Sequence, residues 1–180
     1  CKPNFRRMPG LFTIPIGGIK NGHHTFEFEI NKPFFDQFEE SEIKEGELTA
    51  VADLVKSSSH IDLDIRISGN VSLFCDRCLE IFDHPVDCEN RLLVKFGSAR
   101  DDSDPEIITV PHDENELDLK QYFYEFIHLA LPIKRVHPDN ADGVSTCDPV
   151  MLQKLKEHLV EDDKGDDPRW DELKKLMNDN

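Results

Sequence analysis

The sequence lacks any apolar run long enough to cross a bilayer as a helix, which needs about 20 residues. It also lacks an excess of basic residues. The sequence has 21 Lys and Arg and 37 Asp and Glu, which gives a formal charge of −16. We therefore expect no contact with membranes, and no nucleic-acid binding through a broad basic surface, since that affinity grows with the number of phosphates neutralised. Such a charge balance attracts basic partners instead.

The motifs of several common enzyme classes are missing as well. There is no phosphate-binding G-x-x-x-x-G-K-[ST] loop, no G-x-S-x-G nucleophile elbow and no H-E-x-x-H zinc motif. A nuclease would need clustered catalytic carboxylates or a nucleophile beside a base, and no pattern in the sequence indicates either. We therefore expect a protein that binds other molecules and is not an enzyme.

Cysteine is scarce, but its distribution is uneven. The chain has five cysteines, an odd number, and no visible secretory signal. This favours a cytoplasmic protein with reduced thiols, in which closely spaced cysteines more often bind a metal than form a disulfide. Three of the five lie in the stretch CDRCLEIFDHPVDC at 75–88, and two of these are spaced C-x-x-C. This stretch is the main chemical signal in the chain.

Alternation of apolar and polar residues predicts the first half of the fold. Odd-numbered apolar residues from Ile61 to Cys75 predict one long half-buried strand, and even-numbered ones from Val86 to Phe96 predict a returning strand. Earlier alternating segments also predict strands. Consecutive strands joined by short turns favour an antiparallel meander, with one packed face and one face in water.

Helical periodicity appears later in the chain. Segment 118–131 has an apolar helical stripe, and Pro132 ends the predicted helix. Asp118 and Gln121 resemble a capping box at its start. Four residues of the stripe are expected to face the sheet: Leu119, Phe123, Phe126 and Ile127. The acidic segment 97–116 is expected to be mostly loop, with EIITV as a short strand.

Together these patterns predict a single α+β domain, in which a curved, mostly antiparallel and partly barrel-like sheet is packed by one long amphipathic helix. The core is expected over residues 11–135. Residues 1–10 are expected to be an N-terminal extension, unstructured or foreign to the native protein. Residues 136–180 are expected to form an acidic loop and a C-terminal helical segment, including a last helix from Pro168.

The C-x-x-C pair falls at the predicted turn between the two long strands, which is the arrangement of a zinc knuckle. Zinc takes four thiolate or imidazole ligands, so two more are needed. Cys88 shares a face with apolar neighbours and is interpreted as a small buried apolar residue. A polar loop after the helix offers one histidine and one cysteine. The predicted zinc ligands are Cys75, Cys78, His137 and Cys147.

Two alternatives to a metal stay open for the C-x-x-C pair. One is a redox dithiol, and the other is a turn held by hydrogen bonds without a metal. A redox pair usually lies at the start of a helix that follows a strand. Here a strand follows the pair, so the redox interpretation is the least favoured of the three.

The ordered set of motifs resembles the YceD family of bacterial and plastid proteins. Cys75, Arg77 and Cys78 match its C-x-R-C signature, the residues LDL…E…LALP…H over 117–137 match its acidic helix, and DPR…L..L over 167–176 matches its C-terminal helix. The resemblance covers roughly residues 60–180. It implies a ribosome-biogenesis factor without established enzymatic activity, associated with the accumulation and processing of large-subunit ribosomal RNA.

Two binding mechanisms are compatible with that implied role. In the first, a local basic strip contacts the ribosomal RNA precursor. The six candidate residues are Arg66, Arg77, Arg91, Lys95, Lys134 and Arg135. In the second, the acidic surface binds and chaperones a basic ribosomal protein with no direct RNA contact, because charge complementarity speeds such an encounter.

Overall fold

The structure, a computed structural model, describes residues 6–7, 12–39, 41–98, 101–104 and 106–159. Its strands are β1 (Arg6–Arg7), β2 (Thr13–Pro15), β3 (Gly22–Ile30), β4 (Glu45–Lys56), β5 (His60–Phe74), β6 (Ile81–Gly97), β7 (Asp101–Asp104), β8 (Ile107–Pro111) and β9 (Glu116–Asp118). Its helices are α1 (Lys32–Phe35), α2 (Lys120–Ala130) and α3 (Pro149–His158).

The predicted α+β fold is confirmed. A seven-stranded sheet has the order β1-β3-β4-β5-β6-β8-β7, and β2 pairs with β9 in a separate small sheet. The long strands β3 to β6 form the predicted antiparallel meander. Because the strand order is linear, the sheet stays open and does not close into a barrel. Within the described residues, no helix combines the length and apolarity needed to cross a membrane.

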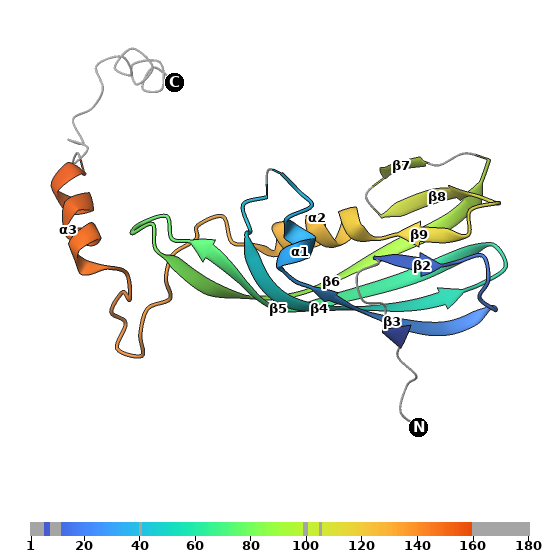
Figure 1. Cartoon of the computed structure of the whole chain (residues 1–180), viewed down its shortest axis with the longest axis horizontal. Coiled ribbons are helices and arrows are strands. Elements are labelled where there is room, and N and C mark those ends of the chain that lie inside the picture. Colours follow the sequence, from blue (N-terminus) through green and yellow to red (C-terminus); the bar gives the residue numbers. More distant parts are fainter. Residues whose placement is uncertain (1–5, 8–11, 40, 99–100, 105, 160–180) are drawn as a thin grey trace, which may run out of the picture.

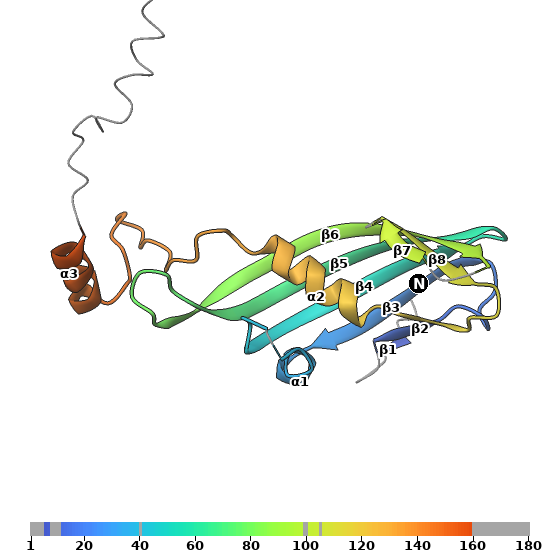
Figure 2. The same cartoon turned by 90° about the horizontal axis from the view of Figure 1, so that it is seen from above.

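One face of the sheet is packed, and no element among the described residues covers the other, which we call the uncovered face (Figure 1, Figure 2). Figure 1 shows α2 and the β2–β9 pair on the same side of the long strands, and Figure 2 shows α2 lying obliquely across them. Phe123 of α2 is fully buried, and its ring centroid lies 5.2 Å from that of Phe28 in β3. Leu119 and Ile127 are fully buried and Phe126 nearly so. The predicted inward face of the helix is therefore confirmed.

The acidic segment 97–116 is more regular than its composition suggested. It contributes β7, β8 and part of β9, so the prediction of mostly loop was wrong. The short strand predicted at EIITV is present as β8, which pairs in parallel with the end of β6. Ile108 and Val110 of β8 are fully buried. Burial of these two apolar residues extends the core and stabilises a strand in this segment, although the residues around it are acidic.

The predicted capping box of α2 does not form. The helix begins at Lys120 after Leu119 as N-cap, with no side-chain hydrogen bond at the cap. Asp118 instead pairs with Thr13 in the β2–β9 sheet, and its Oδ1 accepts a hydrogen bond from the Lys120 N–H at 2.8 Å. Gln121 donates to Glu125 within the helix. The pairing with β2 therefore holds Asp118 in a strand and shortens the helix at its start.

The two ends of the chain lie partly outside the described residues. Within 1–10, the structure describes Arg6–Arg7, whose backbone pairs in parallel with β3 at Phe26 and Glu27. In the C-terminal part, α3 lies within 136–180, where a loop and a helical segment were predicted. The last predicted helix, from Pro168, falls outside the described residues.

Gly69 permits the close pairing of β4 with β5, opposite Leu48. Its φ is +148°, and a Cβ placed there would lie 2.6 Å from Leu48 Cα and closer still to the carbonyl oxygen of Glu47. The backbone atoms of Glu47 and Leu48 are held in the paired strand and cannot move aside. We therefore expect Gly69→Ala to lower the free energy of unfolding by about 2 kcal/mol or more. Urea denaturation followed by circular dichroism measures this change.

Gly18→Ala is the matched control, because a Cβ at Gly18 meets no atom within 4 Å. It should change the free energy of unfolding by less than about 0.5 kcal/mol. Equal effects of the two substitutions would contradict the tight approach at Gly69.

Candidate metal centre

The C-x-x-C pair lies in the turn between β5 and β6. The Cys75 N–H donates to the carbonyl oxygen of Glu80 at 2.9 Å, and the Leu79 N–H donates to that of Cys75 at 2.9 Å. Leu79 adopts the left-handed region with φ of 63°, which allows the chain to reverse at this point. Cys75 and Cys78 are both buried. We call residues 75–80 the knuckle.

Two hydrogen bonds join the loop that follows α2 to the knuckle, one between backbone groups and one to a side chain. The Asp76 N–H donates to the carbonyl oxygen of Arg135 at 2.7 Å, and the Arg135 N–H donates to Asp76 Oδ2 at 2.7 Å. These paired bonds fix the backbone two residues before His137. His137 also packs on Phe82 of β6, with ring centroids 4.9 Å apart. Its ring is thus oriented with Nδ1 toward the knuckle sulfurs.

Cys147 is positioned by the start of α3. Asp148 is the N-cap of that helix, and its side chain accepts hydrogen bonds from the N–H groups of Val150 and Met151. On the other side, the Thr146 hydroxyl donates to the carbonyl oxygen of Pro138 at 2.7 Å. The capped helix and the closed loop together hold Cys147 in a buried position beside His137.

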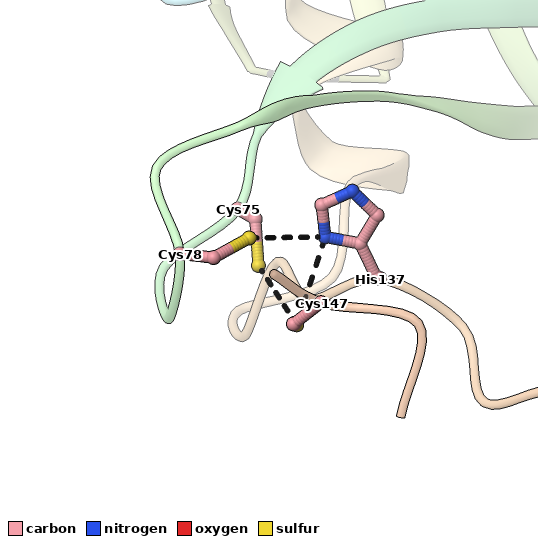
Figure 3. Close-up of side chains that lie close together, drawn as sticks. All are labelled: Cys75, Cys78, His137 and Cys147. Atoms are coloured by element: carbon pink, nitrogen blue, oxygen red, sulfur yellow. Dashed lines mark hydrogen bonds between the residues drawn. The ribbon is translucent and has the colours of Figure 1, made fainter. Parts of the chain in front are cut away.

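Figure 3 shows the four predicted ligands converging on one point. Cys78 Sγ lies 3.4 Å from His137 Nδ1, Cys75 Sγ lies 3.6 Å from Cys147 Sγ, and Cys147 Sγ lies 3.6 Å from His137 Nδ1. All four donor atoms lie within 4.8 Å of one another, close enough to hold a metal ion. In tetrahedral zinc sites, bonds of about 2.0 to 2.3 Å put neighbouring donor atoms about 3.3 to 3.8 Å apart. The three donor distances given above fall in that range.

Backbone N–H groups lie close to the sulfur atoms of Cys75 and Cys78. Burial opposes ionisation of Cys75, but the N–H groups of Cys78, Arg77 and His137 lower the pKa of this thiol below its ordinary value. Burial raises the pKa of Cys78, although the N–H groups of Glu80 and Asp148 act in the opposite direction. Metal-bound cysteine is a thiolate, so these donors would stabilise the charge that a metal ion requires.

The positions of the cysteines also help to decide between a metal site and its two alternatives, a redox dithiol and a metal-free turn. The knuckle joins two strands and does not start a helix, which disfavours a redox dithiol. None of the three sulfurs is in a disulfide, since Cys75, Cys78 and Cys147 are all free. Without a metal, three thiols and an imidazole would share one site through weak sulfur hydrogen bonds alone. Cys88 lies outside the site and packs against the core, but it is half-buried and not fully buried as expected.

The six basic residues predicted to contact RNA fall into two separate groups. Arg66 and Arg91 lie on the uncovered face of the sheet, where both form ion pairs. Arg66 pairs with Glu89 at 3.1 Å and Arg91 with Asp62 at 2.8 Å. Lys95 lies farther along the same face of β6. These ion pairs neutralise part of the basic charge on the uncovered face.

The second basic group lies around the knuckle. Arg135 pairs with Glu42 at 2.6 Å. Lys134 is exposed, and Arg77 is half-buried with its Nε lacking a hydrogen-bond partner among the described residues. The six residues therefore do not make one continuous strip, and each group is local.

The sequence analysis missed how strongly acidic the uncovered face is. On β3 to β6, the strand register brings ten carboxylates onto it against three Lys or Arg. The acidic residues are Glu27, Glu29, Glu45, Glu47, Asp53, Asp62, Asp64, Asp83, Asp87 and Glu89, and the basic ones are Arg66, Arg91 and Lys95. The alternation rule places each of these residues on the polar side of its own strand, but it does not say that the four strands lie side by side with these sides together.

A comparison with protein-family models identifies a family for this chain. The model described as large ribosomal RNA subunit accumulation protein YceD matches residues 63–177. The matched range contains all four candidate ligands and most of the two strands that form the knuckle hairpin. Searches of curated proteins and of solved structures find no match for this chain.

We expect protein purified without a chelator to contain about one zinc ion per chain, because structural zinc sites bind with about 10 kcal/mol or more. Cys147→Ser removes one buried ligand and should reduce the zinc content to less than ~0.2 per chain. Cys88→Ser is the matched control and should keep the full content. Elemental analysis of the three proteins measures the result, and wild-type protein without zinc would rule out the site.

Metal removal should also lower thermal stability, because the metal would join the knuckle to the loop that carries His137 and Cys147. We expect a strong chelator at neutral pH to lower the Tm of the wild-type protein by at least several degrees. The same treatment should leave the Tm of Cys147→Ser unchanged. Differential scanning fluorimetry measures both Tm values. If the chelator lowers the Tm of both proteins equally, it acts at a place other than the candidate metal site.

Proposed function

The chain belongs to the family of the large ribosomal RNA subunit accumulation protein YceD, and on this basis we propose that it promotes the accumulation of large-subunit ribosomal RNA as a non-enzymatic binding factor. The family description supports a role in the accumulation of large-subunit ribosomal RNA. The mechanism is inferred from the surfaces of this chain. In a cytoplasmic setting, where thiols stay reduced, the knuckle cysteines remain available to a metal.

Zinc is the metal that we assign to Cys75, Cys78, His137 and Cys147. Three thiolates and one imidazole are a typical donor set for structural zinc. Four protein ligands would complete the coordination and leave no position for water or substrate, so the metal would have a structural role. Its task would be to hold the knuckle, the loop after α2 and the start of α3 together as one rigid end of the molecule.

The observation that favours a protein partner over RNA is the negative charge of the uncovered face of the sheet. On β3 to β6 this face presents ten carboxylates against three Lys or Arg, and Arg66 and Arg91 already form ion pairs there. RNA phosphates would be repelled by such a surface, whereas a basic protein would be attracted to it. We therefore infer that the chain binds a basic ribosomal protein of the large subunit.

Direct contact with the ribosomal RNA precursor is a second candidate mechanism. Arg77, Lys95 and Lys134 support it, since none of the three forms an ion pair with another described residue. Arg77 and Lys134 lie at the knuckle end of the molecule, away from most of the acidic face. Three cations neutralise few phosphates, so this contact would be local and strongly weakened by salt.

The test of the protein mechanism is to offer purified basic ribosomal proteins of the large subunit one at a time. We expect wild-type chain to bind at least one of them without RNA, and Glu47→Lys/Asp87→Lys to weaken that binding about tenfold at low salt, because two attractive charges are reversed. Fluorescence anisotropy with a labelled ribosomal protein measures Kd.

The matched control is Asp113→Lys/Glu125→Lys, which makes the same change in net charge at exposed positions outside the acidic face. It should leave Kd within about twofold of wild type. If ribosomal RNA precursor alone binds the wild-type chain, and Arg77→Glu/Lys134→Glu abolishes that binding, the RNA mechanism is the correct one.

A further inference from the structure

The end of the sheet beside the metal centre carries three exposed apolar side chains. Phe74, Leu79 and Ile81 are 54%, 66% and 61% exposed. Phe74 and Ile81 are cross-strand partners at the ends of β5 and β6, so their side chains lie together on the uncovered face. Leu79 comes from the turn between them. We call these three residues the tip patch.

The backbone of Leu79 indicates that its side chain has a use outside the chain. Among the described residues, Leu79 is the one non-glycine residue with a positive φ. A residue with a Cβ in this conformation is destabilised by about 1 to 2 kcal/mol relative to glycine. Burial of the Leu79 side chain offsets little of this cost, since two thirds of the side chain stays exposed. A glycine would make a more stable turn, so a leucine here points to an intermolecular contact.

The tip patch is also rigidly held. Phe74 directly precedes Cys75, and Leu79 directly follows Cys78. The hydrogen bonds of the knuckle and the buried cysteines therefore fix the backbone on which the patch is built. A preformed apolar surface loses little conformational entropy when a partner binds, which increases affinity.

A negatively charged groove continues from the tip patch along the uncovered face. Ser72 and Asp83 lie two residues inward from Phe74 and Ile81 on the same two strands. They line a groove of about 560 Å³ together with residues of β4 and α1. Its carboxylates are Asp83, Glu45 and Glu47, and its one cation is Lys32, which is paired with Glu45 at 2.8 Å. The groove thus has unneutralised negative charge beside an apolar surface.

We propose that the tip patch and the adjoining groove are the docking surface for an apolar and basic segment of a ribosomal protein. An apolar side chain of the partner would pack on the tip patch, and its Lys or Arg side chains would enter the groove. This inference rests on the proposed function and names the surface that performs it. The same carboxylates disfavour RNA, and they disfavour a second copy of this chain, which would bring like charge to the contact.

Leu79→Gly is the most informative variant, because it removes an apolar contact while relieving the backbone at the turn. We expect it to keep or raise the Tm, to retain the metal, and to weaken binding of the ribosomal protein about fivefold or more. Phe74→Ser/Ile81→Ser should weaken binding more than tenfold. The control is Val55→Ser, also exposed on this face but at the opposite end of β4, which should leave Kd unchanged.

Each outcome of this experiment decides between the two proposals. If the ribosomal protein binds the wild type and both tip-patch variants equally well, the docking surface is wrong and the proposed function stands. If no basic large-subunit ribosomal protein binds the wild type, the proposed function fails and the docking surface fails with it. If the variants instead lose binding to naked ribosomal RNA, or convert a dimer to a monomer in sedimentation, the occupant is RNA or a second copy and the inference is overturned.

Discussion

The uninterrupted pairing of β5 with β6 fixes the positions of both faces of the sheet and of the knuckle. The two strands pair from His60 with Lys95 to Phe74 with Ile81. Since side chains alternate along a strand, a shift of one residue would expose the apolar row that now forms the core and bury the carboxylates. It would also move Cys75 relative to Cys78 and open the candidate metal site. One register therefore sets the core, the acidic face and the site at the same time.

The candidate metal centre depends on a second, long-range constraint. Packing of α2 on the sheet brings the following loop back over the hairpin end, and the two hydrogen bonds between Asp76 and Arg135 hold it there. His137 and Cys147 then meet the knuckle from a distant part of the chain. The site thus links the sheet, the loop after α2 and α3. Apolar residues beside it, at the tip patch, are held by the same contacts.

Features set by local pattern or by ligand chemistry could be predicted from the sequence, whereas features set by pairing between distant segments could not. Alternation located the long strands, and the need for four ligands selected His137 and Cys147. The capping box failed because β2 pairs with Asp118, and the ion pair of Arg66 with Glu89 arises across strands. The acidic face was missed because ten carboxylates gather only when four strands are placed in register.

The spacing of the four ligands along the chain implies an order of assembly during synthesis. Cys75 and Cys78 are only three positions apart, whereas Cys147 follows Cys75 by 72 residues. The hairpin leaves the ribosome first and offers two thiols, and the remaining donors arrive only after α2 has been made and packed. A bound ion would then close a loop of that length, which reduces the entropy of the unfolded chain more than a short crosslink does. Full coordination would thus mark a chain in which the hairpin, α2 and the loop after it have already folded.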